Sequence, residues 1–242
     1  MTYFLKMSLS SVIGIFQRPF RKNEILQQLY FVGNGSLIII IFCVCFAAVV
    51  TILESSFHMK MVIQNDSMVP GFAALLILRE LGAVVTALLL TSRVGAGFAA
   101  EVGSMQVTEQ VDALKMLGID PIQYLVSPRL IACILGSIAL VTVANLTCIF
   151  SAMLVSENML GYSTQMFLTS MRRFVIFQDL IFALIKGAVF GAVIPLISCY
   201  FGFFCKAGAD GVGKATTQSV VFSSIAIIIL DFVLSYTFSF FY

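Results

Sequence analysis

The stretch ILQQLYFVGNGSLIIIIFCVCFAAVVTIL, residues 25–53, contains 29 residues and no charged side chain. A helix needs about 20 mostly apolar residues to cross the hydrocarbon core of a bilayer. Residues 130–155 and 187–205 are two further charge-free runs, and residues 220–242 are interrupted only by Asp231. The pattern predicts an all-α, polytopic membrane protein.

The composition excludes several other classes of protein. Hydrophobic residues make up 60% and charged residues 11% of the 242 residues, whereas soluble domains carry about 25% charged residues. The net charge is only +2, without a basic tract, so we expect no nucleic-acid partner. The six cysteines lie in or beside apolar runs, which favours buried thiols over a disulfide framework.

Residues 68–105 are also apolar but contain four charges, namely Arg79, Glu80, Arg93 and Glu101. As one helix this segment would be roughly 55 Å long, well beyond a hydrocarbon core of about 30 Å. We therefore place the crossing at residues 68–92 and expect the remainder to leave the bilayer.

The predicted architecture is one membrane domain over residues 1–242, with an interfacial helix, five crossings and a short helix between the second and third crossings. Gly33 and Gly35 favour a break before the first crossing. The N-terminus lacks a cleavage site, so we expect no signal peptide. The predicted segments are the interfacial helix 9–32, the crossings 34–55, 68–92, 130–155, 174–203 and 215–242, and the short helix 107–118.

Lysine and arginine residues predict the orientation, because they are enriched in cytoplasmic loops. With a cytoplasmic N-terminus, eight of them fall on the inside and three on the outside. We therefore expect the C-terminus on the outer side and residues 107–118 in the cytoplasm.

The short helix has recognisable start and stop signals. Thr108 is a candidate N-cap, Glu109 and Asp112 would lie in the first turn, and Gly118 followed by Pro121 would end the helix. An isolated helix of about nine residues is marginal in water, so we expect a partner surface to hold it. The alternative is an interfacial helix packed on its own protein.

Charged residues inside predicted crossings are the strongest functional signal, because they are costly there and usually face the protein interior, a cavity or a partner. Arg79, Glu80, Lys186 and Asp231 fall at similar depths in their crossings. We hypothesise that Lys186 pairs with Asp231, since their helices would be antiparallel neighbours. The alternative is that each residue reaches the interface or a backbone carbonyl separately.

Small residues recur every four positions and predict close helix packing. They are Gly95, Ala99 and Gly103 in one segment and Gly187 and Gly191 in another.

Apparent enzyme motifs fail on inspection. Residues 208–215, GADGVGKA, lack the hydroxyl residue that ends a phosphate-binding loop, and residues 95–100 lack the strand of a dinucleotide site. The only histidine, His58, has no second histidine beside it for a metal site. We expect no catalytic residues, no metal and no cofactor in this chain. Residues 65–67 form a glycosylation sequon, which has meaning only in a eukaryotic secretory protein.

Residues 78–132, LRELGAVVTALLLTSRVGAGFAAEVGSMQVTEQVDALKMLGIDPIQYLVSPRLIA, closely resemble the signature of the MlaE/YrbE permeases. Residues 215–235, ATTQSVVFSSIAIIILDFVLS, resemble the last helix of that family, and the similarity covers most of the chain from about residue 23. RELG, EVGSM, TEQVDAL and DP occur in the family's order. Ala83 stands where the family usually has proline, and Gln218 where a basic residue is common, which bears on head-group preference.

The resemblance implies an ABC-transporter permease of the bacterial inner membrane, with a periplasmic C-terminus, that moves phospholipid or related lipid between membranes. Two copies would associate with a cytoplasmic ATPase dimer, which would hold ATP and magnesium, and with an outer-face MCE-domain protein. The coupling residues toward the ATPase would be Thr108, Glu109, Gln110, Asp112 and Leu114. The candidates for the lipid cavity would be Arg79, Glu80, Leu81, Lys186 and Asp231.

Two other functions remain open from the residues. An ion-coupled secondary transporter would use Glu80 and Asp231 as proton carriers and would need no ATPase. A non-transporting membrane scaffold would tolerate substitution of Glu109 and Asp112 without loss of lipid homeostasis.

Overall fold

The computed structural model describes residues 2–16, 21–62, 68–206 and 208–240. These residues form helices joined by short turns, and no strand occurs within these ranges. The helices are α1 Thr2–Phe16, α2 Lys22–Val62, α3 Val69–Leu76, α4 Gly82–Leu90, α5 Ala96–Val107, α6 Gln110–Met116, α7 Pro121–Met159, α8 Thr164–Phe174, α9 Phe177–Phe203 and α10 Ala209–Ser239. Residues 65–67, the sequon, lie outside the described residues, as do residues 17–20 of the predicted interfacial helix.

Within the described residues, five helices are long and apolar enough to cross a membrane, which confirms the predicted all-α fold class. Four of them are α2, α7, α9 and α10. The other runs over Val69–Val107, where π-helical turns at Ile77–Leu81 and Thr91–Gly95 join α3, α4 and α5 into one continuous helix of 39 residues.

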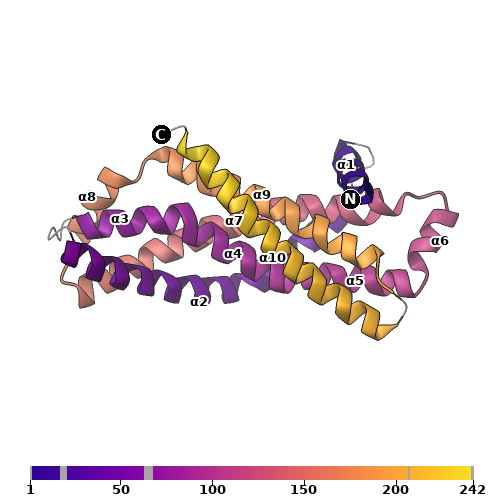
Figure 1. Ribbon diagram of the computed structural model, residues 1–242, viewed down its shortest axis with the longest axis horizontal. Coiled ribbons are helices and arrows are strands. Elements are labelled where there is room, and N and C mark those ends of the chain that lie inside the picture. The colour runs from indigo at the N-terminus through magenta and orange to yellow at the C-terminus, as the bar shows by residue number, and fades with distance from the viewer. Residues whose placement is uncertain (1, 17–20, 63–67, 207, 241–242) are drawn as a thin grey trace. The chain divides into compact units, whose positions relative to one another are not determined.

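The chain divides into two compact units. The first contains Met1–Ser36, Ala87–Ser137 and Ala188–Tyr242, and the second contains Leu37–Thr86 and Ile138–Gly187. In the first unit α10 packs along α5, and in the second α8 packs against α3 (Figure 1). The helices α2, α7 and α9 each contribute residues to both units.

Small residues allow close helix contact in the first unit. A Cβ atom built on Gly95 would lie 3.1 Å from Ser198 Oγ, and one on Gly202 would lie 2.7 Å from Val102 Cβ. A Cβ on Gly191 would overlap Ser137 Oγ. Ala99, one helical turn from Gly95 and from Gly103, is fully buried. Residues without bulky side chains thus bring α5, α9 and α7 together at short range.

The predicted break near Gly33 and Gly35 is wrong, because α2 continues without interruption from Lys22 to Val62. Gly35 instead makes room for a neighbouring cation, since a Cβ there would overlap the Arg93 guanidinium. The Arg93 guanidinium donates from Nη1 to Ser36 Oγ at 2.7 Å and to the Phe31 carbonyl at 3.2 Å. The glycine therefore serves a close side-chain approach, and the segment 9–32 is divided between α1 and the first turns of α2.

The loop that follows α7 contains a helix that the sequence pattern did not predict. Ser163 caps α8, accepting a hydrogen bond on Oγ from the Met166 N–H at 3.3 Å, and Gly161 before it has a φ of +75°. The next long helix, α9, begins at Phe177, so residue 174 of the predicted crossing 174–203 belongs to α8.

Candidate functional site

Two charged residues of the second unit lie in the π-helical turn Ile77–Leu81. A π turn inserts an extra residue into an α-helix, is rare, and occurs frequently at functional sites. Here it carries Arg79, Glu80 and Leu81 within the first third of a helix long enough to span a bilayer.

Arg79 binds a buried carboxylate from the start of α9. Its Nε donates to Asp179 Oδ1 at 2.7 Å, and the Ile176 N–H donates to the second oxygen, Oδ2, at 2.9 Å. Asp179 is fully buried and lies in the first turn of α9, where the helix dipole favours a negative charge. Each Asp179 oxygen therefore has a donor, as a buried carboxylate requires.

Lys186, two turns further along α9, holds the other charge of the π turn. Its Nζ donates to Glu80 Oε2 at 2.8 Å and to the Arg79 carbonyl at 3.0 Å, and lies 4.9 Å from the centre of the Phe182 ring. Lys186 is fully buried, whereas the Glu80 side chain is 43% exposed. Arg79, Glu80, Asp179 and Lys186, called the charge cluster below, thus form two adjacent ion pairs.

The charge cluster buries one partner of each pair and leaves the other partly accessible. Asp179 and Lys186 are inaccessible, whereas the Arg79 side chain is 28% exposed. The partly exposed members of the cluster are therefore one cationic side chain, Arg79, and one anionic side chain, Glu80. Arg79 and Glu80 can together bind a polar group that carries one negative and one positive charge, because the negative charge would meet Arg79 and the positive charge Glu80.

The helix α8 holds this end of the second unit in place. The Gly71 N–H in the first turn of α3 donates to Ser170 Oγ at 3.0 Å, so a side chain from α8 satisfies an N–H that has no partner within its own helix. A Cβ atom on Gly71 would lie 2.6 Å from the Ser170 carbonyl oxygen. Because Asp179 follows α8 by only five residues, this contact helps to fix its position.

The structure brings together three of the five predicted cavity residues, Arg79, Glu80 and Lys186, and places Leu81 in the same π turn. Asp231 belongs to the other compact unit, so its predicted pairing with Lys186 stays a prediction. Sequence reasoning missed Asp179. The available signal was its spacing of seven residues from Lys186, which places both side chains on one face of α9.

In the first unit, α6 is the predicted short helix, but its start is different from the prediction. Thr108 is not its N-cap: Thr108 ends α5, and its Oγ1 donates to the Ser104 carbonyl at 2.9 Å. Glu109 occupies the capping position with a φ of 59°, and no side chain caps the helix. The Thr108 hydroxyl donates to a carbonyl of α5 and does not cap α6. Glu109, in the left-handed region, forms the turn between the two helices.

The predicted end of α6 is correct. Gly118 has a φ of +74°, and its N–H donates to the Lys115 carbonyl at 3.0 Å, while the Ile119 N–H donates to the Leu114 carbonyl at 3.0 Å. These two bonds form a Schellman motif, which ends helices at glycine. Asp120 then caps α7 through Oδ1, which accepts from the Ile122 N–H at 3.0 Å, with Pro121 as the first helical residue.

One face of α6 packs on the protein and the other is open. Val111 is buried, whereas Glu109, Gln110 and Asp112 are exposed and Leu114 is partly buried. Met116 and Leu117 were not predicted as site residues, yet they are 89% and 75% exposed. Large apolar side chains at this exposure are typical of surfaces that bind another protein.

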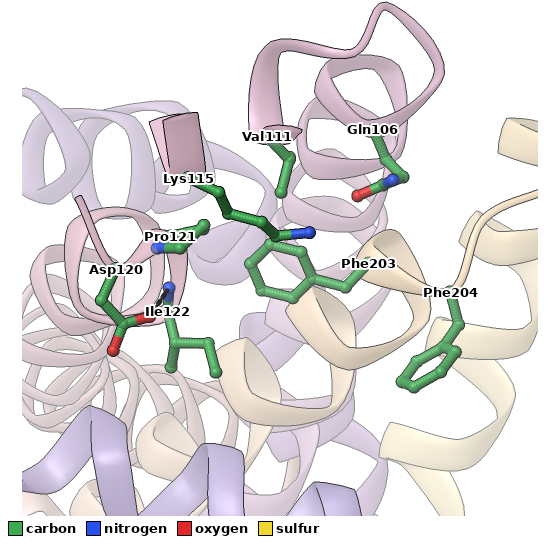
Figure 2. A pocket seen from close by; sticks show the side chains of 8 residues that line it. All are labelled: Gln106, Val111, Lys115, Asp120, Pro121, Ile122, Phe203 and Phe204. Atoms are coloured by element: carbon green, nitrogen blue, oxygen red, sulfur yellow. Dashed lines mark hydrogen bonds between the residues drawn. The ribbon is translucent and has the colours of Figure 1, made fainter. Parts of the chain in front are cut away.

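A cavity of about 340 Å³ lies beside α6 (Figure 2). Val111 and Lys115 reach it from α6, Gln106 from α5, and Phe203 and Phe204 from the end of α9. The exposed apolar residues and this cavity give α6 an irregular surface into which a partner can fit.

An ion pair lies in the same unit. Arg129 Nη2 lies 2.9 Å from Glu101 Oε2, and its Nη1 donates to the Leu125 carbonyl at 2.9 Å. The Arg129 side chain is only 4% exposed, and its guanidinium carbon lies 5.7 Å from the centre of the Phe98 ring. These contacts join α5, which leads into α6, to α7, which follows it.

These features define a class of protein before any relative is considered. The chain is a multi-pass membrane protein with two charge pairs between apolar helices and a short helix that exposes apolar residues between two others. This combination is typical of a transport subunit that responds to a separate protein.

The chain belongs to the MlaE permease family, since the model of that family, described as Permease MlaE, matches residues 25–237. A probable ABC transporter permease of Rickettsia felis is 38% identical over 232 residues, which cover 96% of this chain and 89% of the relative. One from Synechocystis is 36% identical over 224 residues, or 93% and 85% of the two chains. The chain is therefore an ABC-transporter permease subunit, of a family that lacks an ATPase domain.

A plant protein is also similar. The chloroplastic protein trigalactosyldiacylglycerol 1 of Arabidopsis thaliana is 38% identical over 224 residues, which cover 93% of this chain and 64% of that protein. Its name contains that of a glycolipid.

Proposed function

We propose that this permease moves phospholipid or a related lipid between membranes, driven by a separate cytoplasmic ATPase and linked to an outer-face MCE-domain protein. The observation that carries the proposal is the charge cluster, because it has one partly exposed arginine and one partly exposed glutamate within a helix that can span a bilayer. A lipid named in a relative adds support.

Lipid transfer poses a physical problem that this chain is suited to solve. Exposing an acyl chain to water costs about 0.8 kcal/mol per CH₂ group, so the tails must stay covered during transfer. Two copies of the permease would enclose an apolar cavity for the tails. In this cavity, Arg79 would contact the phosphate of the lipid, and Glu80 would contact an amine or hydroxyl group of its head group.

Energy would enter through α6. The ATPase would bind Met116 and Leu117 together with Glu109, Gln110 and Asp112, and ATP and magnesium would bind to the ATPase alone. The ATPase would bind one arrangement of α5 and α7 more tightly than another. This difference in affinity would shift the equilibrium between the two arrangements. We place the chain in a bacterial inner membrane because of its resemblance to the MlaE permeases, and its N-terminus in the cytoplasm because of its lysine and arginine distribution.

Copurification tests this proposal. The full chain, extracted in mild detergent with an affinity tag, should retain an ATPase, an MCE-domain protein and phospholipid, all identified by mass spectrometry. Leu117→Asp should release the ATPase and leave the lipid bound, whereas Arg173→Gln, on the exposed face of α8, should release neither. Recovery of the chain with lipid but without any ATPase would contradict the proposed energy source.

A further inference from the structure

A second cavity of the first unit takes no part in the function proposed above. It has a volume of about 400 Å³ and lies between the end of α9 and the start of α10. A Cβ atom on Gly103 would lie 3.5 Å from Cys205 Cβ and 3.8 Å from Val212 Cγ1, so this junction packs on the last turns of α5. The residues that shape the cavity, called the lysine pocket below, are Tyr200, Phe201, Phe204, Lys206, Lys214 and Gln218.

The lysine pocket is positively charged. Lys206 and Lys214 line it, both exposed, and no carboxylate is among its described lining residues. Lys214 Nζ donates to Asp210 Oδ2 at 2.7 Å, and Asp210 is not among the lining residues. An ammonium group has three donors, so Lys214 keeps two for a ligand after this bond. The pocket therefore attracts a group that carries negative charge and accepts several hydrogen bonds.

Aromatic rings also line the pocket and continue onto α10. The Tyr200 and Phe204 ring centres are 4.8 Å apart, and those of Phe201 and Phe222 are 5.1 Å apart. Phe222 and Ile225 are about half exposed on α10. Phe222 follows Lys214 by eight residues, or about 12 Å along the helix axis. Gln218 lies between Lys214 and Phe222 on this face of α10, and the apolar surface begins at Phe222 and Phe201 beyond it.

We propose that the lysine pocket binds an anionic glycerophospholipid of the adjoining leaflet, with the phosphate between Lys206 and Lys214 and an acyl chain on Phe201 and Phe222. A zwitterionic lipid would bring its own ammonium group close to the two lysines and would bind less well. A soluble phosphate could use the lysines but would leave the aromatic rings uncovered. Because the pocket shares no residue with the charge cluster, this site does not depend on lipid transport.

The bound lipid would fix the junction between α9 and α10. Gly211 is packed so closely that a Cβ atom there would overlap the Lys206 carbonyl, and Gly208 has a φ of +94°. The phosphate would link Lys206, before this tight turn, to Lys214, after it. Phe204 also lines the cavity beside α6, so the lipid would stabilise the neighbourhood of α6.

Native mass spectrometry of the delipidated full chain in detergent tests this proposal. Dioleoyl phosphatidylglycerol and dioleoyl phosphatidylcholine have the same chains, so their difference in affinity reports the head group. We expect the anionic lipid to bind at least roughly tenfold more tightly, since each lysine near a lipid surface contributes a factor of about five. Lys206→Gln with Lys214→Gln should remove most of this preference and leave phosphatidylcholine binding unchanged.

Matched variants separate this site from a general charge effect. Lys22→Gln with Arg172→Gln removes two exposed cations elsewhere and should keep the preference, as should Lys206→Arg with Lys214→Arg. If the double glutamine variant does not fold, each single glutamine variant should still lower phosphatidylglycerol affinity about three- to fivefold. Phe201→Ala should weaken both lipids equally.

Four results would overturn the proposal. The first is an unchanged preference in the glutamine variants, and the second is an equal loss in the Lys22 and Arg172 control. The third is tight binding of glycerol phosphate, which has no acyl chain and would assign the pocket to a soluble anion. Release of the copurifying ATPase from the glutamine variants, without loss of lipid, would assign the lysines to a protein interface.

Discussion

The charge cluster and the helix α6 both carry charged side chains, but they satisfy them differently. In the charge cluster, two fully buried residues, Asp179 and Lys186, hold two partly exposed ones at 2.7 and 2.8 Å. On α6, Asp112 and Lys115 pair at 2.7 Å with both side chains more than half exposed. The buried charges of the charge cluster require partners, whereas the exposed pair on α6 leaves a surface that another protein can bind.

This difference predicts where substitutions act. Breaking a buried ion pair is expensive, because it leaves an uncompensated charge, whereas an exposed pair contributes about 0–1 kcal/mol. Changes in the charge cluster should therefore lower the free energy of unfolding. Changes on α6 should alter the response to the ATPase and leave the fold intact.

The largest expected effect is that of Asp179→Ala. It removes the partner of Arg79 and of the Ile176 N–H, so we expect a loss of about 3 kcal/mol in the free energy of unfolding. Thermal unfolding of the purified chain in detergent measures it, with Asp112→Ala as the exposed control. The double variant Arg79→Met with Asp179→Ala should recover part of the loss. An equally small change in both aspartate variants would show that Asp179 is not a structural anchor.

Lys186→Met should cost about 2 kcal/mol, less than Asp179→Ala because Glu80, the carboxylate left behind, is partly exposed and can bind water. Glu80→Gln in the same chain should reduce this loss. Charge exchange also tests the hypothesis that Lys186 pairs with Asp231. The exchange Glu80→Lys with Lys186→Glu should restore more of the stability lost in the single variants than the exchange Lys186→Asp with Asp231→Lys. The opposite order would favour the Asp231 pairing.

Leu117→Asp should lower ATP-dependent transport at least tenfold and change the free energy of unfolding by less than about 0.5 kcal/mol, since Leu117 is exposed and outside the core. Transport in vesicles and thermal unfolding, measured on the same preparation, check the two parts. A variant that unfolds easily, or one that transports normally, would remove α6 from the coupling role.

Gly35→Ala and Gly33→Ala form a matched pair within α2. Alanine at position 35 would displace Arg93 from Ser36, so we expect a loss of about 1 kcal/mol. No atom lies within 4 Å of a Cβ at position 33, so alanine there should stabilise the helix by about 0.5–1 kcal/mol. Comparable losses in both variants would mean that the backbone breaks at this point after all.

The smallest effect should be that of Asp112→Asn on stability. Its partner Lys115 is exposed and three residues away on the same helix, so the change should stay below about 0.5 kcal/mol. Denaturation at low and high salt checks this, because any contribution of the pair should vanish at high salt. A larger loss would mean that α6 depends on its own side chains more than on a partner.

Much of the fold could be predicted, because the signals are local. Long apolar runs, three of them free of charge, identified the five long helices, and Gly118 marked the end of α6. A single sequence does not say which helices are neighbours. The partner of Arg79 on α9 was therefore missed, and so were the π turn at Ile77–Leu81 and the amphipathic helix α8.

Two local signals were misleading for a physical reason. Gly35 indicated a break because glycine weakens helices, but here its small size admits the Arg93 side chain. Thr108 is a good N-cap residue, but its hydroxyl already donates to the helix before it. In both cases a contact that the local sequence does not reveal decided the role of the residue: the Arg93 side chain for Gly35 and the Ser104 carbonyl for Thr108.

The most direct test of the account is lipid transfer by the purified transporter in vesicles. Labelled phospholipid should move between membranes when ATP is added, should stop when the ATPase active site is inactivated, and should stop with Leu117→Asp in this chain. Lipid movement that follows a proton gradient and continues in the absence of ATP and of the ATPase would contradict it.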